Sequence, residues 1–151
     1  MTLTARSKNK SGFTLIELMI AIAIIGILAA AFLNNFFSSI VRGRDSRRKQ
    51  DLRTISQALE LYYNDNRRYP DDIPPAGESF THPANPDTIY LTETPDDPMV
   101  GKNYCYETAD GSWYRLAATL ENTSDPDVSP TVVTCGGVNN NYGVTSPNIT
   151  L

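Results

Sequence analysis

The feature that most constrains this 151-residue chain is an apolar run near its N-terminus. Residues 13–33 read FTLIELMIAIAIIGILAAAFL, and only Thr14 and Glu17 are clearly polar. A helix needs about 20 apolar residues to cross the ~30 Å hydrocarbon core of a bilayer. The run therefore predicts a transmembrane helix, and the remaining residues suffice for one modest globular domain.

The charge is divided unevenly along the chain. Residues 1–70 carry eleven basic and five acidic side chains, whereas residues 71–151 carry two basic and twelve acidic ones. Proteins that bind nucleic acid neutralise phosphates mainly with Lys and Arg, so the acidic half is not expected to bind nucleic acid. The two halves are suited to different surroundings.

Glu17 is unexpected inside a membrane helix. A carboxylate there costs a few kcal/mol, of which the helix dipole offsets only about 0.3–1 kcal/mol. The basic leader, residues 1–12, suggests a compensating cation. A cut after Gly12 would precede the apolar run and leave it in the mature chain. The new α-amino group of Phe13 would then lie one helical turn from Glu17, in the same chain or in a neighbouring one.

This stretch resembles the leader junction and N-terminal helix of the type IV pilin family, which includes the pseudopilins of type II secretion systems. GFTLIELMIAIAIIGILAAAF carries the resemblance, over about the first third of the chain. It implies that a prepilin peptidase cleaves between Gly12 and Phe13, and that Phe13 is then N-methylated. It also implies that Glu17 recruits a subunit into the filament by neutralising the N-terminus of the adjacent one.

Two further features bear on the membrane segment. Asn34 and Asn35 stand where many family members have a helix-distorting proline. Because Asn also has a low helix propensity, the sequence does not decide between a continuous helix and one that unwinds locally here. Basic residues flank both ends of the run, so charge alone leaves its orientation undecided. The resemblance implies a cytoplasmic leader. The basic cluster at 42–49 is predicted to be a solvated helix face near lipid head groups.

Beyond the membrane run, residues 34–66 are predicted to continue the helix. Leu52, Ile55, Leu59 and Tyr62 recur at intervals of three and four residues, which places them on one stripe. Asn64–Asn66 and the proline at position 70 end the pattern. Residues 71–102, rich in Pro, Asp and Thr, are predicted to form a long surface loop containing the short strand-like TIYLTE.

Residues 67–151 are predicted to be a globular β-sheet domain outside the cytoplasm. NYCYE and WYRLAATLE flank a turn with Asp110 and Gly111, which is typical of a β-hairpin. TVVTC (131–135) is expected to add a third strand. The expected fold is α+β: a long N-terminal α-helix packed on a small antiparallel β-sheet, as in pilins.

Cys105 and Cys135 are the only cysteines. An even number of cysteines in an extracytoplasmic domain favours a disulfide between them. The bond would close a loop of the chain and stabilise the fold by about 3–4 kcal/mol. Together with the distant His82 they make a poor zinc site, which normally has four ligands.

The segment LENTSDPDVS groups four oxygen-bearing side chains that are candidate calcium ligands. These are Glu121, Asn122, Asp125 and Asp127. The alternative is a solvated acidic turn. Major pseudopilins carry a calcium site in a C-terminal loop, although no motif matches residue by residue here.

No catalytic set emerges from the sequence, so an enzyme is not expected. The expected function is the structural subunit of a type IV pilus filament that polymerises through its apolar helix. The alternative is a pseudopilin of a type II secretion system; a DNA-uptake minor pilin and a membrane-anchored enzyme rank lower. Expected partners are further copies of the chain, the prepilin peptidase and the inner-membrane assembly machinery. The chain would lie in the inner membrane before assembly and in a surface or periplasmic filament afterwards.

Replacing Gly12 with a bulkier residue, as in Gly12→Val, is expected to leave the leader attached. Intact-mass measurement on chain extracted from cells would then give the unprocessed mass, without N-methylation at Phe13. A normal mature mass for the variant would place the cut elsewhere.

Overall fold

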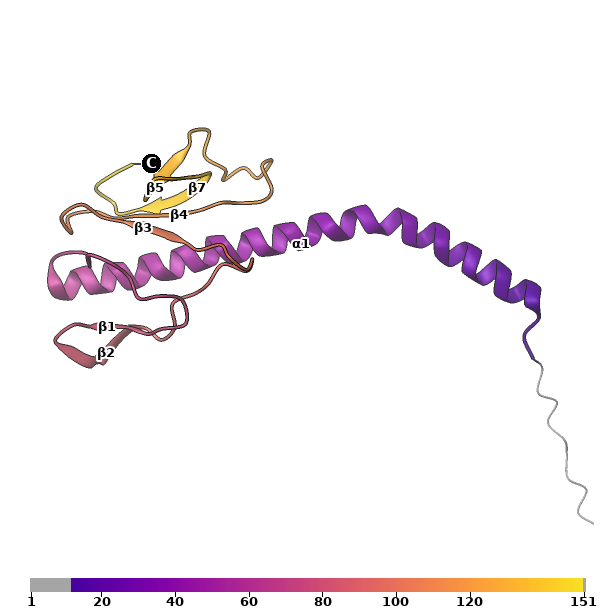
Figure 1. Cartoon of the computed structure of the whole chain (residues 1–151), viewed down its shortest axis with the longest axis horizontal. Helices are drawn as coiled ribbons and strands as arrows, with labels where there is room; N and C mark the ends of the chain where they lie inside the picture. Colours follow the sequence, from indigo (N-terminus) through magenta and orange to yellow (C-terminus); the bar gives the residue numbers. More distant parts are fainter. Residues whose placement is uncertain (1–11, 151) are drawn as a thin grey trace, which may run out of the picture. The chain divides into compact units, whose positions relative to one another are not determined.

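The computed structural model describes residues 12–150, apart from the side chains of residues 31–35. Residues 1–11, most of the predicted leader, lie outside the described residues. Within the described part, one helix is followed by seven short strands (Figure 1). The elements are α1 (Leu15–Asn66), β1 (Phe80–His82), β2 (Asn85–Leu91), β3 (Cys105–Glu107), β4 (Arg115–Ala118), β5 (Val133–Cys135), β6 (Val138–Asn140) and β7 (Tyr142–Thr145). A long helix with small antiparallel sheets confirms the predicted α+β fold.

α1 runs through two units of the chain, which divide between Ser39 and Ile40. In the first unit the helix exposes large apolar side chains on all sides: Leu15, Ile16, Leu18, Met19, Ile20, Ile22, Ile24, Ile25, Ile27 and Leu28. Across the described residues, no helical stretch has both the length and the hydropathy that crossing a membrane requires.

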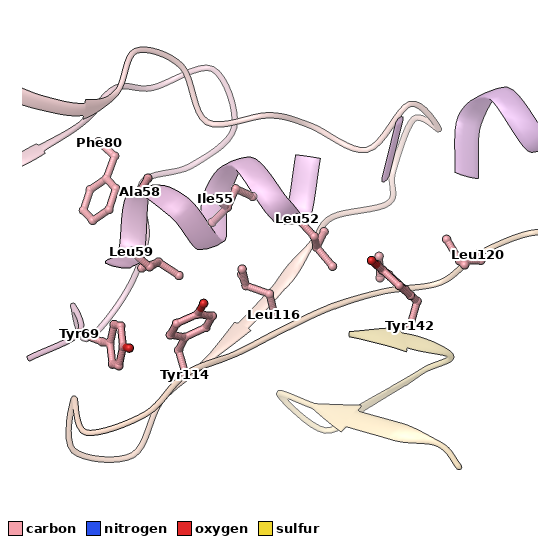
Figure 2. Packing of buried hydrophobic residues seen from close by; sticks show 11 residues of the cluster. Leu52, Ile55, Ala58, Leu59, Tyr69, Phe80, Tyr114, Leu116, Leu120 and Tyr142 are labelled. Atoms are coloured by element: carbon pink, nitrogen blue, oxygen red, sulfur yellow. The ribbon is translucent and has the colours of Figure 1, made fainter. Parts of the chain in front are cut away.

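In the second unit one stripe of α1 is buried in the core. Leu52, Ile55 and Leu59 are fully or almost fully buried, and Tyr62 packs against the same cluster, as the spacing predicts. Figure 2 shows Leu52 and Leu59 on the side of the helix toward Leu116 and Tyr114, in the same buried cluster. Burying a Leu or Ile side chain contributes about 1.5–3 kcal/mol, so this stripe fixes the outer half of the helix to the domain.

The main sheet has the strand order β3–β4–β7, all antiparallel. Cys105 of β3 pairs with Ala117 of β4, which confirms the predicted hairpin; Gly111 takes a φ of 75° in its turn. Leu116 pairs with Val144 of β7 on the other side. β7 is therefore the third strand of this sheet, a place that the sequence analysis assigned to residues 131–135.

The predicted strand at residues 131–135 does form, as β5, but with another partner. β5 pairs with β6 in a separate two-stranded hairpin. The reason is the turn between them, where Gly136 and Gly137 take φ values of 56° and 78°. Two successive positive-φ residues match the tight turn that joins adjacent antiparallel strands, so the chain folds back at once. The predicted membership of the main sheet is wrong for this strand.

The predicted long loop at residues 71–102 is also more ordered than expected. β1 and β2 form an irregular antiparallel hairpin within it, and the strand-like TIYLTE lies mostly in β2. The ring of Phe80 stacks on Tyr62 of α1 with 5.3 Å between centroids, and Tyr90 packs on both. Aromatic contacts with the helix supply the order that local sequence composition did not predict.

The disulfide between Cys105 and Cys135 is present, with the two Cα atoms 6.0 Å apart. It joins β3 of the main sheet to β5 of the second hairpin. Beside it, Ala117 and Val133 form a second small buried cluster. The cross-link therefore ties together two sheets that share little other buried surface.

Truncating the buried stripe should weaken the domain. Leu59→Ala removes a fully buried side chain and is expected to lower the free energy of unfolding by about 2–5 kcal/mol. Leu61→Ala is the matched control, because Leu61 lies on the same helix and is 56% exposed; it should change stability by less than about 0.5 kcal/mol. Urea unfolding of the full chain in detergent measures both. Equal losses for the two variants would contradict this assignment of the core.

Candidate functional site

Glu17 caps the start of α1. Thr14 precedes the helix, and its backbone N–H and its hydroxyl both donate to Glu17 Oε2, at 2.8 and 2.7 Å. In return the Thr14 hydroxyl oxygen lies 3.3 Å from the backbone N–H of Glu17. This is a capping box, in which a side chain three residues into the helix satisfies the backbone at its start. The T-x-x-E spacing was visible in the sequence, but the sequence analysis did not use it.

The expected cleavage junction lies directly before this cap. Gly12, Phe13 and Thr14 precede the helix and are exposed, with the Phe13 side chain 93% exposed. No described atom lies within 4 Å of the position that a Gly12 side chain would take. A peptidase would therefore meet an extended, accessible segment followed by a capped helix. Cleavage and methylation here stay predictions.

A buried cluster of charges lies farther along α1. Arg48 is 1% exposed, and its guanidinium donates to Asp45 at 2.8 Å, to Asp97 at 2.7 and 2.9 Å, and to Glu121 at 2.7 Å. Arg44 donates to the same Glu121 carboxylate. A buried charge is tolerated when paired charges and hydrogen bonds compensate it. The predicted solvated basic face is thus wrong for Arg48, whose side chain lies inside the domain.

The four predicted calcium ligands lie on the loop that this cluster holds. Lys49 Nζ donates to Asp125 at 2.5 Å and to Asp127 at 2.7 Å. The backbone N–H groups of Glu121 and Asn122 donate to Asp45 at 2.9 and 2.8 Å. Among residues 12–150, no group of three or more His, Cys, Asp or Glu side chains is placed to hold a metal ion. Calcium binding stays a prediction.

The pKa values of the cluster follow from its contacts. Hydrogen bonds from Arg44, helped by those from Arg48, lower the pKa of Glu121 to about 2 against the opposing effect of burial. Burial raises the pKa of Asp97, but the Arg48 hydrogen bonds and the N–H of Met99 outweigh it, so the net pKa is lowered. Both carboxylates are therefore ionised in the folded chain well below neutral pH.

Comparison with known proteins identifies two matching regions. Residues 7–33 match the family described as prokaryotic N-terminal methylation motif. Residues 35–117, more than half of the chain, match the family described as type II secretion system (T2SS), protein G. Together they span the helix and the start of the main sheet.

Individual relatives give the same result. The type II secretion system core protein G of Vibrio cholerae serotype O1 is 29% identical over 107 residues, covering 67% of this chain and 73% of the relative. That of Pseudomonas aeruginosa is 35% identical over 107 residues, covering 66% and 74%. The type IV major pilin protein PilA of Myxococcus xanthus is 39% identical over 71 residues, covering 47% and 32%. No solved structure matches the chain.

The charge cluster predicts loss of stability in acid. A carboxylate whose pKa is lowered by folding stabilises the fold above its unfolded pKa, and this contribution is lost as pH falls through the folded value. For Glu121 that window runs from about pH 4.5 to about pH 2. The Glu121→Gln chain should therefore be less stable than the parent at pH 7 by on the order of 2 kcal/mol, a difference that shrinks across this window. Urea unfolding in detergent at several pH values measures it.

Glu78→Gln is the matched control for this experiment. Glu78 is exposed and has no ion pair within the described residues. Its variant should follow the parent at every pH. If the difference in free energy of unfolding between the parent and Glu121→Gln stays constant from pH 7 to pH 2, the charge of the Glu121 carboxylate does not account for it.

Proposed function

Because this chain belongs to the family of the type II secretion system protein G, we propose that it is a pseudopilin, the subunit of a short periplasmic filament that acts in protein secretion. The observation that carries the proposal is the family match over residues 35–117, together with relatives that are mostly type II secretion system core proteins. Members of this family and of the pilins are structural subunits, not enzymes.

The surface pilus, placed first in the sequence analysis, becomes the second candidate. The pilin PilA supports it, but the match spans less of this chain than the secretion proteins do. Both candidates share one architecture, a helical filament of identical subunits. They differ in location, because a pilus extends from the cell surface whereas a pseudopilus stays in the periplasm. They also differ in the process that fails when the chain is absent.

The proposal assigns a role to each part of the chain. Residues 1–12 are removed, residues 13–33 hold the subunit in the inner membrane and then pack in the filament core, and residues 34–66 carry the domain at 67–151. The exposed apolar side chains between Leu15 and Leu28 support this assignment, because a helix that is apolar on all sides requires a lipid or protein environment. The partners are further copies, the prepilin peptidase and the assembly machinery.

Glu17 would have two roles in succession. Before assembly its carboxylate is satisfied within the chain, by Thr14. During assembly it would meet the positively charged N-terminus of the adjacent subunit, which only cleavage creates. The cap offsets part of the cost of placing a carboxylate in an apolar helix.

Calcium at Glu121, Asn122, Asp125 and Asp127 is a secondary proposal. Glu121, Asp125 and Asp127 are paired with Arg44, Arg48 and Lys49, so calcium would have to replace these cations as their partner. Binding would therefore require the loop to rearrange around its helix contacts.

Complementation of cells that lack this chain tests the proposed function. The parent chain is expected to restore release of secreted proteins into the medium, with no surface filaments recovered by shearing. Surface filaments that contain the chain, with secretion unchanged by its loss, would support the pilus and contradict the pseudopilin.

Two substitutions at one position separate the roles of Glu17. Glu17→Gln retains a side chain that can complete a capping box but loses the charge, whereas Glu17→Ala loses both. Both are expected to be cleaved normally, by intact mass, and to fail to restore secretion. Full activity of Glu17→Gln would show that capping alone explains this residue.

A further inference from the structure

A cleft of about 550 Å³ lies in the second unit, between the proline-rich residues 72–76 and the residues that lead into β3. Ile55 of α1 contributes to its lining. Five of the other lining residues carry rings: Pro74, Pro75, Pro95, Tyr104 and Tyr106. Flat apolar faces of this kind accept a planar or aliphatic group.

Thr94 places an unused hydrogen-bonding group in this lining. The residue is 5% exposed, and its hydroxyl has no partner among the described residues. Its backbone is satisfied, because its N–H donates to the Glu78 carbonyl and its own carbonyl accepts from Gly77 N–H, at 2.8 and 2.9 Å. A buried polar atom without a partner destabilises a folded protein. Thr94 therefore places an unpaired, buried hydroxyl in the wall of the cleft.

The rim of the cleft is acidic. Asp72 and Asp96 line it, and Glu93 lines an adjoining cleft that shares Thr94. All three carboxylates are exposed, and none of them makes an ion pair within the described residues. Residues 69–101 contain seven acidic side chains and no Lys or Arg. One cation, Arg47, lies in the adjoining cleft, 3.7 Å from Asp51.

This combination suits an arginine side chain. A guanidinium is planar, stacks on rings and carries five N–H donors for carboxylate and hydroxyl oxygens. The tyrosine and proline rings therefore offer it stacking. Asp72 and Asp96, which each accept one backbone N–H and make no ion pair within the described residues, offer it charged acceptors. A phosphate or another anion would be repelled by the same carboxylates.

The exposed face of α1 carries such an arginine. Arg53 is exposed and has no ion pair among the described residues. The exposed positions on the same face are uncharged: Ser46, Gln50, Gln57 and Leu61. Glu60, seven residues after Arg53, is half-buried and accepts hydrogen bonds from the hydroxyls of Tyr69 and Tyr114. Arg53 and Ile55 are two positions apart, about 200° around a helix with 3.6 residues per turn. Because Ile55 faces the cleft, Arg53 points away from it, and any Arg53 that reaches the cleft belongs to another molecule.

We propose that the cleft of one copy binds the Arg53 side chain of a second copy, so that the acidic rim docks on the exposed face of α1. The inference rests on the proposed function, which brings many copies side by side in one filament. Charge complementarity supports this occupant, because the acidic rim meets a helix face on which Arg53 has no ion pair among the described residues. The contact would give adjacent subunits a fixed register outside the apolar core of the filament.

Cysteine cross-linking tests this contact directly. The chain's two native cysteines are joined to each other, so the introduced thiols are the only free ones. Filaments of full-length chain carrying Arg53→Cys and Asp96→Cys are expected to form disulfide-linked ladders on mild oxidation. Arg53→Cys with Asp87→Cys is the matched control, because Asp87 is exposed and does not line the cleft. It should give no ladder.

Charge exchange provides a second measurement that does not depend on cysteine geometry. Arg53→Glu and Asp96→Lys are each expected to lower the yield of sedimented filaments about fivefold, since each places like charges together. The chain with both substitutions should recover to within about twofold of the parent, because the charges again match. Arg67→Glu, at an exposed position beyond the end of α1, should have no effect.

The outcomes separate this inference from the proposed function. Normal filaments without a ladder and without charge rescue would overturn the contact and leave the pseudopilin intact. Filaments insensitive to Arg53→Glu, with secretion lost in Asp96→Lys, would show that the cleft binds a cationic group of another protein, and would overturn this occupant. Failure of the parent chain to form filaments would contradict both.

Discussion

The guanidinium of Arg48 is buried among carboxylates that come from separate parts of the chain. Asp45 lies one turn earlier on α1, Asp97 follows the β1–β2 hairpin, and Glu121 follows β4. Since an unpaired buried charge costs several kcal/mol, Arg48 can stay inside only while carboxylates of this set stay with it. This one side chain therefore fixes both loops on the helix. The rest of the domain, including the cleft that the loop at 94–96 lines, depends on that attachment.

One helix serves two different environments. In the unit before Ile40, α1 exposes large apolar side chains on all sides between Leu15 and Leu28. In the second unit, only a stripe is apolar, and it is buried by the sheet and the hairpin. The same helix thus carries two side-chain patterns. The first, apolar on all sides, suits contact with lipid or with other copies, and the second, a single apolar stripe, suits packing within one folded domain. That division is what a subunit stored in a membrane and used in a filament requires.

Local patterns were predictable, and long-range pairings were not. The stripe at Leu52, Ile55 and Leu59 and the hairpin around Gly111 follow from periodicity and turn chemistry, which act between neighbours in sequence. The burial of Arg48 depends on acids 49 and 73 positions away, and no local signal distinguishes it from the exposed Arg47. The pairing of β4 with β7 was missed for the same reason. The cap formed by Thr14 and Glu17 joins residues only three positions apart, so the sequence itself shows its pattern.

The disulfide has a consequence for a polymer. Subunits packed in a filament hold their side chains at a very high effective concentration, so a free thiol on one copy would react readily with a disulfide on the next. In this chain the two cysteines are paired, and no free thiol is left to begin such an exchange. In the proposed filament each subunit would be covalently closed on itself, so copies could join or leave without exchanging disulfides.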